Sequence, residues 1–76
     1  MNFKQGDLVL IDCEQRTYDS QLKLTEIKRG TPGTIVREWT YYESRARGEQ
    51  QWAEVWLGGD LITHVACRNL TPLEKV

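Results

Sequence analysis

The sequence predicts an all-β domain of five strands that close into a small barrel, with a long loop after the first strand. The first observation is an ordered series of strand-like and turn-like segments between residues 30 and 73. The second is a clean alternation of side chains over residues 51–57, and the third is the hairpin turn signal Gly58-Gly59-Asp60. The 76 residues leave room for one domain, residues 1–76, whose core is expected to be barely sufficient.

The first strand is predicted at Leu8–Ile11, a continuous apolar run that is rich in β-formers and too short for a helix. Residues 13–29 are polar with scattered apolar positions, and they allow two interpretations. One is a long loop pinned by a few apolar side chains, and the other is a short helix over residues 20–28 with Ser20 as its N-cap. The loop is favoured, because loops of this length in small barrels are usually pinned rather than regular.

A turn is predicted at Gly30-Thr-Pro-Gly33, where Pro32 fixes one φ angle and Gly33 permits the positive φ that the next position needs. A strand over residues 34–39 follows it directly. Its partner over residues 51–57 carries small aliphatic side chains that are expected inside the barrel: Ala53, Val55 and Leu57. The intervening side chains are expected on the outer side: Trp52, Glu54 and Trp56.

Residues 40–50 between these two strands are polar and charged, so we expect a mobile hairpin tip near Arg45, Arg47 and Gly48. The turn at residues 58–60 leads into a strand over residues 61–66. Residues 69–73 then indicate a 3₁₀ turn that plugs the barrel with Leu70 before a last short strand.

Charge and composition limit the partners and the compartment. Ten Lys+Arg against 11 Asp+Glu give a formal net charge of −1, which creates no global field to attract polyanions. The first residues do not resemble a secretion signal, and no apolar run approaches the roughly 18–20 residues that cross a bilayer. We therefore expect a soluble cytoplasmic protein with no membrane role. Cys13 and Cys67 are expected as reduced thiols, with a disulfide between them as the less favoured alternative.

The side chains do not predict an enzyme. His64 is the only histidine and lies within a predicted strand, where a structural role is favoured over acid–base chemistry. Cys13, Cys67 and His64 lack the paired spacing of zinc ligands, so no metal and no cofactor is expected. Gly30 and Gly33 are not followed by the Gly-Lys-Ser/Thr of a phosphate-binding loop.

Aromatic residues gather between residues 39 and 56 and supply the candidate binding surface. Exposed aromatic side chains mark recognition surfaces, because they bury much area at little entropic cost. The alternative, equally open from the sequence, is a second minicore under residues 13–29, with Tyr18, Leu22 and Ile27 packed on the aromatics. The candidate partner-binding residues are Trp39, Tyr41, Arg45, Arg47, Trp52 and Trp56.

Three segments resemble the SH3-like barrels: Gly6-Asp7-Leu-Val-Leu-Ile11, Gly30-x-x-Gly33-x-Ile35-Val36 and Asn69-Leu70-x-Pro-Leu73. These barrels include the KOW and Tudor modules and small photosynthetic accessory subunits such as the PsaE-like subunits. The C-terminal two-thirds is also similar to the NifZ family of nitrogenase maturation proteins, and Cys67-Arg68 is the distinctive match. The NifZ resemblance implies an accessory protein that docks on a larger metalloenzyme and has no active site of its own.

The sequence therefore favours a non-catalytic protein-interaction module, an accessory or assembly subunit of a larger intracellular complex such as a metalloenzyme or electron-transfer complex. The alternative is a nucleic-acid-binding module of KOW or Tudor type, in which the aromatics stack on bases. Its phosphate contacts would come from Lys28, Arg29, Arg37, Arg45 and Arg47. Convergence of these basic residues on the aromatic face would favour nucleic acid, whereas carboxylates among them would favour protein docking. Those carboxylates are Glu38, Glu43 and Glu54.

Overall fold

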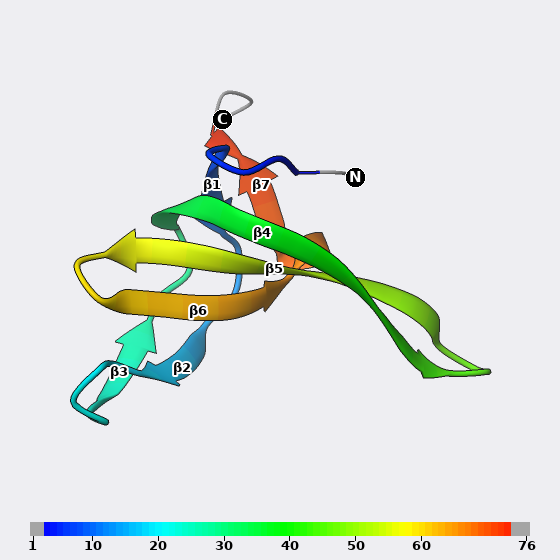
Figure 1. Cartoon of the computed structure of the whole chain (residues 1–76), viewed down its shortest axis with the longest axis horizontal. Coiled ribbons are helices and arrows are strands. Elements are labelled where there is room, and N and C mark those ends of the chain that lie inside the picture. The colour runs from blue at the N-terminus through cyan, green and yellow to red at the C-terminus, as the bar shows by residue number, and fades with distance from the viewer. Residues whose placement is uncertain (1–2, 74–76) are drawn as a thin grey trace.

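The computed structural model describes residues 3–73, with the backbone alone for residue 43. The elements in this range are strands and one 3₁₀ turn, η1, which confirms the all-β prediction (Figure 1). Residues 3–73 contain no helix that is long and apolar enough to cross a membrane. The elements are β1 (Leu8–Ile11), β2 (Gln15–Tyr18), β3 (Leu24–Ile27), β4 (Thr31–Ser44), β5 (Gly48–Gly58), β6 (Leu61–Ala66), η1 (Cys67–Asn69) and β7 (Leu70–Pro72).

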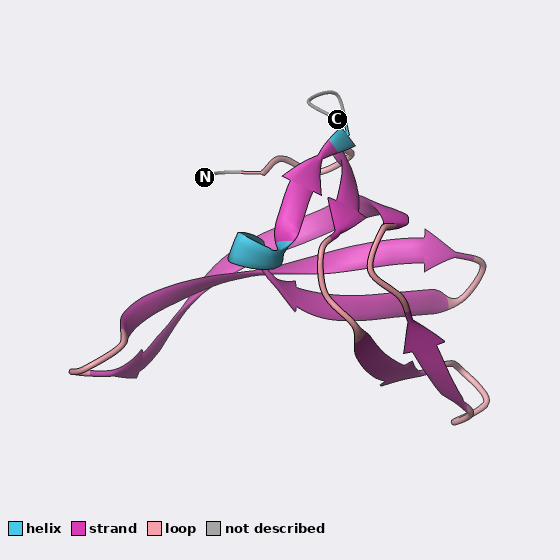
Figure 2. Ribbon diagram, turned by 180° about the vertical axis from the view of Figure 1, so that it is seen from behind, coloured by secondary structure: helices cyan, strands magenta, loops and turns pink. Residues whose placement is uncertain are grey.

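Five strands form one antiparallel sheet in the order β6-β5-β4-β1-β7, and β2 and β3 form a separate two-stranded sheet. Strands β1 and β7 run crosswise to β4, β5 and β6, so the sheet is strongly bent (Figures 1 and 2). The strand pairing of residues 3–73 does not join β6 to β7, and the hydrogen-bonded ladder stays open. The count of five strands is confirmed for the main sheet, while its closure into a barrel is not established.

The interpretation of residues 13–29 as an irregular loop is wrong, because β2 and β3 form a β-hairpin there. The carboxylate of Asp19 closes its turn by accepting the backbone N–H groups of Gln21 and Lys23, each at 2.9 Å. Asx turns of this kind let a polar segment reverse direction without glycine or proline. The alternative of a helix over residues 20–28 is also wrong, and the hydroxyl of Ser20 bonds the Asp60 carboxylate at 3.1 Å instead.

The predicted turn at residues 30–33 lies two residues earlier than expected. Gly30, at φ +91°, is the glycine with a positive φ, and the backbone N–H of Thr31 closes the turn on the Lys28 carbonyl at 3.1 Å. Gly33 belongs to β4 and has no positive φ. A Cβ there would lie 2.4 Å from Cγ1 of Val55, so Gly33 is required by the close approach of β5.

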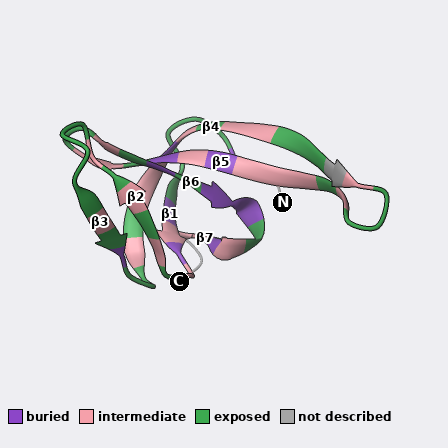
Figure 3. Ribbon diagram, turned by 90° about the horizontal axis from the view of Figure 1, so that it is seen from below, coloured by how far each residue is buried: buried purple, intermediate pink, exposed green. Residues whose placement is uncertain are grey.

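The core lies on the concave side of the bent sheet. Ala53 and Val55 are completely buried and Leu57 is half-buried against the same cluster, which confirms the predicted inner face of β5. Leu70, the first residue of β7, is buried as predicted, but the 3₁₀ turn precedes it, at Cys67–Asn69. Figure 3 shows this division, with buried segments on β1, β5 and β6 and exposed ones on β3. The other core residues include Phe3, Val9, Ile11, Ile27, Ile35 and Val65.

Residues 40–50, predicted as a polar hairpin tip, are mostly a regular extension of β4 and β5. Pairs such as Tyr41 opposite Gln50 continue the ladder to Ser44 and Gly48, leaving a three-residue turn at residues 45–47. This segment, hereafter the arm, projects beyond the rest of the sheet (Figure 1). Thr40, Tyr41 and Tyr42 are β-formers, which explains why the strand persists despite the polar composition of its partner.

Candidate functional site

A β-bulge decides which side chains of β4 face outward. Ile35 pairs with Val55 inside the sheet, and Arg37 pairs with Glu54 outside it, with Val36 as the extra residue between them. Strict alternation from Ile35 would have turned Arg37 and Trp39 into the core, because residues two apart share a face. The inserted residue reverses this phase. Glu38 then faces inward, where its carboxylate accepts the backbone N–H of Phe3 at 2.6 Å.

Cross-strand pairing arranges the outward side chains of β4, β5 and β6 in three rows. The row nearest the arm joins Trp39, Trp52 and Ala66. The middle row joins Arg37, Glu54 and His64, and the far row joins Thr34, Trp56 and Ile62, continued on β1 by Leu8. The outer face is therefore an aromatic row and an apolar row separated by a charged one.

Trp39 is the centre of a group of contacts on this face. Its ring meets that of His64 edge-on, with centroids 5.2 Å apart and planes at 83°. The guanidinium carbon of Arg37 lies 5.2 Å from the Trp39 ring centroid, within cation–π range. Nε of Arg37 also donates to Oε2 of Glu54 at 2.5 Å. We call Trp39, Trp52, His64 and Arg37 the aromatic cluster.

Trp56 does not join the aromatic cluster. It lies four positions after Trp52 along β5, about 13 Å away at roughly 3.3 Å per residue. Its indole N–H donates to the Gly59 carbonyl at 2.9 Å, which holds the ring over the β5–β6 turn. With Leu8, Ile62 and Leu73, all exposed, it forms an apolar patch beside a shallow groove of about 170 Å³.

The remaining predicted site residues lie on the arm. Tyr41 is exposed and follows Trp39 on the outward side of β4, so the structure brings Trp39, Tyr41 and Trp52 onto one surface. Arg45 and Arg47 occupy the turn at the end of the arm, away from the aromatic cluster. From the sequence, Arg37 was expected here only as a phosphate contact of the nucleic-acid alternative, and His64 was not expected on this surface. No local signal reveals a bulge or a contact across three strands.

The alternative of a second minicore under residues 13–29 is not what the structure forms. Tyr18 and Leu22 are 64% and 79% exposed, and Ile27 is buried in the main core. The β2–β3 hairpin lies beside β6 instead, where Gln15 Nε2 donates to the Thr63 hydroxyl at 2.5 Å. The aromatic cluster is therefore not covered by this hairpin.

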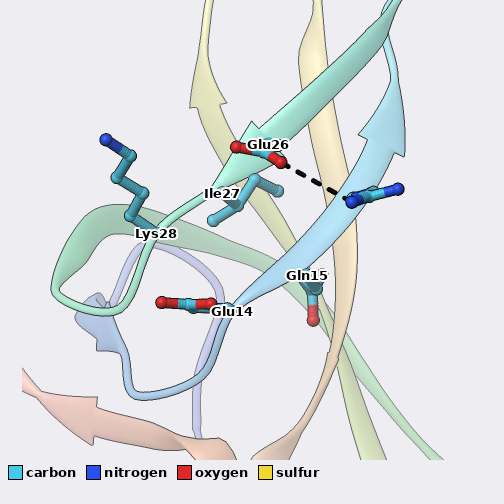
Figure 4. A pocket seen from close by; sticks show the side chains of 6 residues that line it. Glu14, Gln15, Glu26, Ile27 and Lys28 are labelled. Atoms are coloured by element: carbon cyan, nitrogen blue, oxygen red, sulfur yellow. Dashed lines mark ion pairs between the residues drawn. The ribbon is translucent and has the colours of Figure 1, made fainter.

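A second hollow of about 310 Å³ lies on the β2–β3 hairpin (Figure 4). Charged side chains of both signs line it, and Arg16 and Glu26 form an exposed ion pair there at 3.7 Å. Exposed pairs of this kind contribute little energy, and opposite charges leave no net attraction for one class of ligand. The lining residues are Glu14, Gln15, Arg16, Glu26, Ile27 and Lys28.

The remaining candidates for chemistry are the possible metal ligands and the two cysteine thiols. Within residues 3–73, no three or more His, Cys, Asp or Glu residues are grouped as metal ligands would be. Cys13 and Cys67 are both free thiols. Burial raises the pKa of the Cys67 thiol above its ordinary 9.0, and the negative charge of Glu38 raises it further. A buried thiol with a raised pKa is a poor nucleophile near neutral pH.

Comparisons with protein-family models, with curated proteins and with solved structures found no match to this chain. Function is therefore inferred from the geometry of the chain itself.

Proposed function

We propose that this chain is a non-catalytic protein-interaction module, an accessory or assembly subunit that docks on a larger cytoplasmic complex. The observation that carries the proposal is the aromatic cluster, an outward-facing group on a sheet whose opposite face is already buried in the core. Aromatic and arginine side chains dominate the energy of protein interfaces, because they bury a large area and retain a polar handle. The two free thiols suit a reducing compartment.

We also propose that the fold is SH3-like and that the chain is related to the NifZ proteins it resembles. The bent five-stranded sheet and the 3₁₀ turn before the last strand support the fold. In the NifZ-like pair, Cys67 is buried, whereas Arg68 is exposed and donates to the side-chain oxygen of Gln50 at 2.9 Å. Arg68 therefore borders the outer face near Trp52, where it is available to orient an acidic partner such as a metalloenzyme subunit.

Docking would proceed by burial of the aromatic cluster against an apolar surface. The ion pair with Glu54 holds Arg37 beside Trp39, so part of the side-chain entropy is already lost before binding. Tyr41 extends the surface along the arm, and Trp56 extends it through the apolar patch. Arg45 and Arg47 at the end of the arm would meet acidic groups at the rim, where charge guides orientation more than it adds affinity.

Charge geometry favours protein docking over nucleic acid. Lys28 and Arg29 lie at the β3–β4 turn and Arg45 and Arg47 at the end of the arm, so the proposed phosphate contacts are not on one surface. Arg37 does lie on the aromatic face, but Glu54 is its ion-pair partner. Of the three carboxylates expected among the basic residues, Glu54 is there, Glu38 faces inward, and the side chain of Glu43 lies outside the described residues.

The test is an affinity capture of the tagged chain from its own cell extract, with and without nuclease, read by mass spectrometry. A stoichiometric partner that resists nuclease supports the proposal, and Trp39→Ala should abolish its capture. Tyr18→Ala is the matched control, because it removes an exposed aromatic ring from a different surface. Nuclease-sensitive capture of ribosomal or transcription proteins would support the nucleic-acid alternative instead.

A further inference from the structure

The five-stranded sheet protects its edges unequally. On β6, the outward carbonyls of His64 and Ile62 accept hydrogen bonds from Gln15 at 3.1 Å and from Thr17 at 3.4 Å. Strand β7 is three residues long and ends at Pro72, a residue that blocks further pairing. Turn η1 packs against β5 at the base of the arm. Within residues 3–73, the outer edge of β4 along the arm has no such cover (Figures 1 and 2).

The backbone groups on this edge can be assigned from the bonds of Ile35. Its N–H donates to the Asp7 carbonyl and its carbonyl accepts from the Gly6 N–H, both at 2.8 Å, so the backbone groups of Ile35 point away from β5. In an antiparallel pair, the backbone N–H and C=O groups of successive residues point alternately toward and away from the partner strand. After the bulge, the backbone groups of Glu38, Thr40 and Tyr42 therefore point away from β5, toward the open edge. The same alternation places the carbonyls of His64 and Ile62 on the β6 edge, where their observed bonds confirm it.

We propose that two copies of this chain pair antiparallel along this edge of β4, about a two-fold axis at Tyr41. In this register Thr40 of each copy lies opposite Tyr42 of its partner, and each such pair exchanges both of its backbone hydrogen bonds. Tyr41 meets its own counterpart in the closer, non-hydrogen-bonded position on the outer face. The arms then form one continuous four-stranded ribbon, and the aromatic clusters of both copies lie on the same side.

A second copy fits this edge because the segment is self-complementary. Residues 39–42 contain no charged residue and no proline, the devices by which exposed edges usually avoid pairing. Over residues 40–42 the register therefore sets no like charges against each other, and a net charge of −1 gives little repulsion between copies. Tyr41 and Tyr42 are 53% and 60% exposed in the single chain, so pairing covers apolar area that is otherwise in water.

This inference is independent of the docking proposal, because it needs no other protein. It concerns the edge of β4, whereas docking concerns the outer face of β4, β5 and β6, and Tyr41 takes part in both. The outward sides of Trp39 and Trp52 stay in contact with solvent in the paired arms. A purified chain that dimerises without capturing a partner, or the reverse, would separate the two proposals.

The test is the molar mass of the purified full chain by analytical ultracentrifugation over a range of concentrations. We expect a reversible dimer. Thr40→Pro removes an N–H that points away from β5, so the monomer keeps its own ladder, whereas the dimer dissociation constant rises at least about tenfold. Thr40→Val is the matched control, because it keeps this N–H and should remain dimeric.

Tyr41→Lys is a second disrupting variant, in case proline prevents folding, and circular dichroism reports the fold of each variant. It opposes two like charges across the two-fold axis and should yield monomer, while Tyr41→Phe should stay dimeric. Tyr41→Cys should form a disulfide-linked dimer under mild oxidation. A wild-type chain that is monomeric throughout, or a dimer that Thr40→Pro and Tyr41→Lys both leave intact, would overturn the inference.

Discussion

Trp39 and His64 lie on strands β4 and β6, which are separated by β5, yet their rings meet edge-on with centroids 5.2 Å apart. Strands two apart in a sheet are about 10 Å from each other. Both side chains must therefore lean over β5, on the same face as Glu54 and its ion pair with Arg37. The contact ties three strands together on the outer face, opposite the core.

We expect the Trp39–His64 contact to stabilise the fold by about 0.5–1.5 kcal/mol, the range for aromatic pairs beyond area burial. A double-mutant cycle with Trp39→Leu and His64→Leu, measured by urea unfolding, isolates this coupling energy. The same cycle with Trp39 and Thr17 serves as a control, because Thr17 belongs to the β2–β3 hairpin. Additive effects of the Trp39 and His64 substitutions would show that the rings do not interact.

Gly33→Ala should destabilise the fold by about 1–3 kcal/mol, because the new methyl group overpacks the core. Its Cβ would lie 2.4 Å from Cγ1 of Val55 and 3.0 Å from Cδ2 of Leu57. Pro32→Ala, at an exposed position one residue earlier, should change the free energy of unfolding by no more than about 0.5 kcal/mol. Thermal and urea unfolding of both variants check this, and equal effects would contradict the close approach.

Cys67→Ser should cost about 1–3 kcal/mol of unfolding free energy, since it places a hydroxyl in a buried apolar site. Cys67→Ala should cost less, because it leaves only a small cavity and no unpaired polar group. Urea unfolding ranks the two variants. If Cys67→Ser unfolds like the wild type and also keeps its partner, Cys67 has neither a packing role nor the special role that the NifZ likeness suggests.

The raised pKa of Cys67 predicts a loss of stability in alkali. At low pH the thiol is protonated in both states, so it contributes no pH dependence. Above the ordinary pKa of 9.0 the unfolded chain loses this proton before the folded chain does. The free energy of unfolding should therefore fall as the pH rises through this region, and less steeply in Cys67→Ala. Identical slopes for the two proteins would contradict the shift.

Trp56→Ala should leave the chain folded but abolish partner capture. The ring is 43% exposed, so its removal costs contacts with the β5–β6 turn rather than core packing. We expect a loss of about 1–2 kcal/mol, in part from the bond to Gly59. Trp56→Phe keeps an aromatic ring without the N–H and should retain the partner. A collapse of stability in Trp56→Ala would instead assign Trp56 to the core.

Local pattern was sufficient to predict several elements. The strand over residues 61–66 has the predicted bounds, and the inner face of β5 is as expected, because a period of two is a property of the strand alone. The β2–β3 hairpin was not predicted, since its turn depends on side-chain bonds from Asp19 rather than on glycine or proline. The length of the arm was likewise hidden by its polar composition.

The sequence by itself determined an all-β chain, the inner face of β5 and the presence of tryptophans on the outer side of β5. Only the tertiary structure decided which residues share their surface. The extra residue at Val36 turns Arg37 and Trp39 outward and Glu38 inward, and His64 reaches Trp39 across β5. A bulge shifts the phase of every later side chain, and its position depends on the packing of the partner strand, which no local pattern contains.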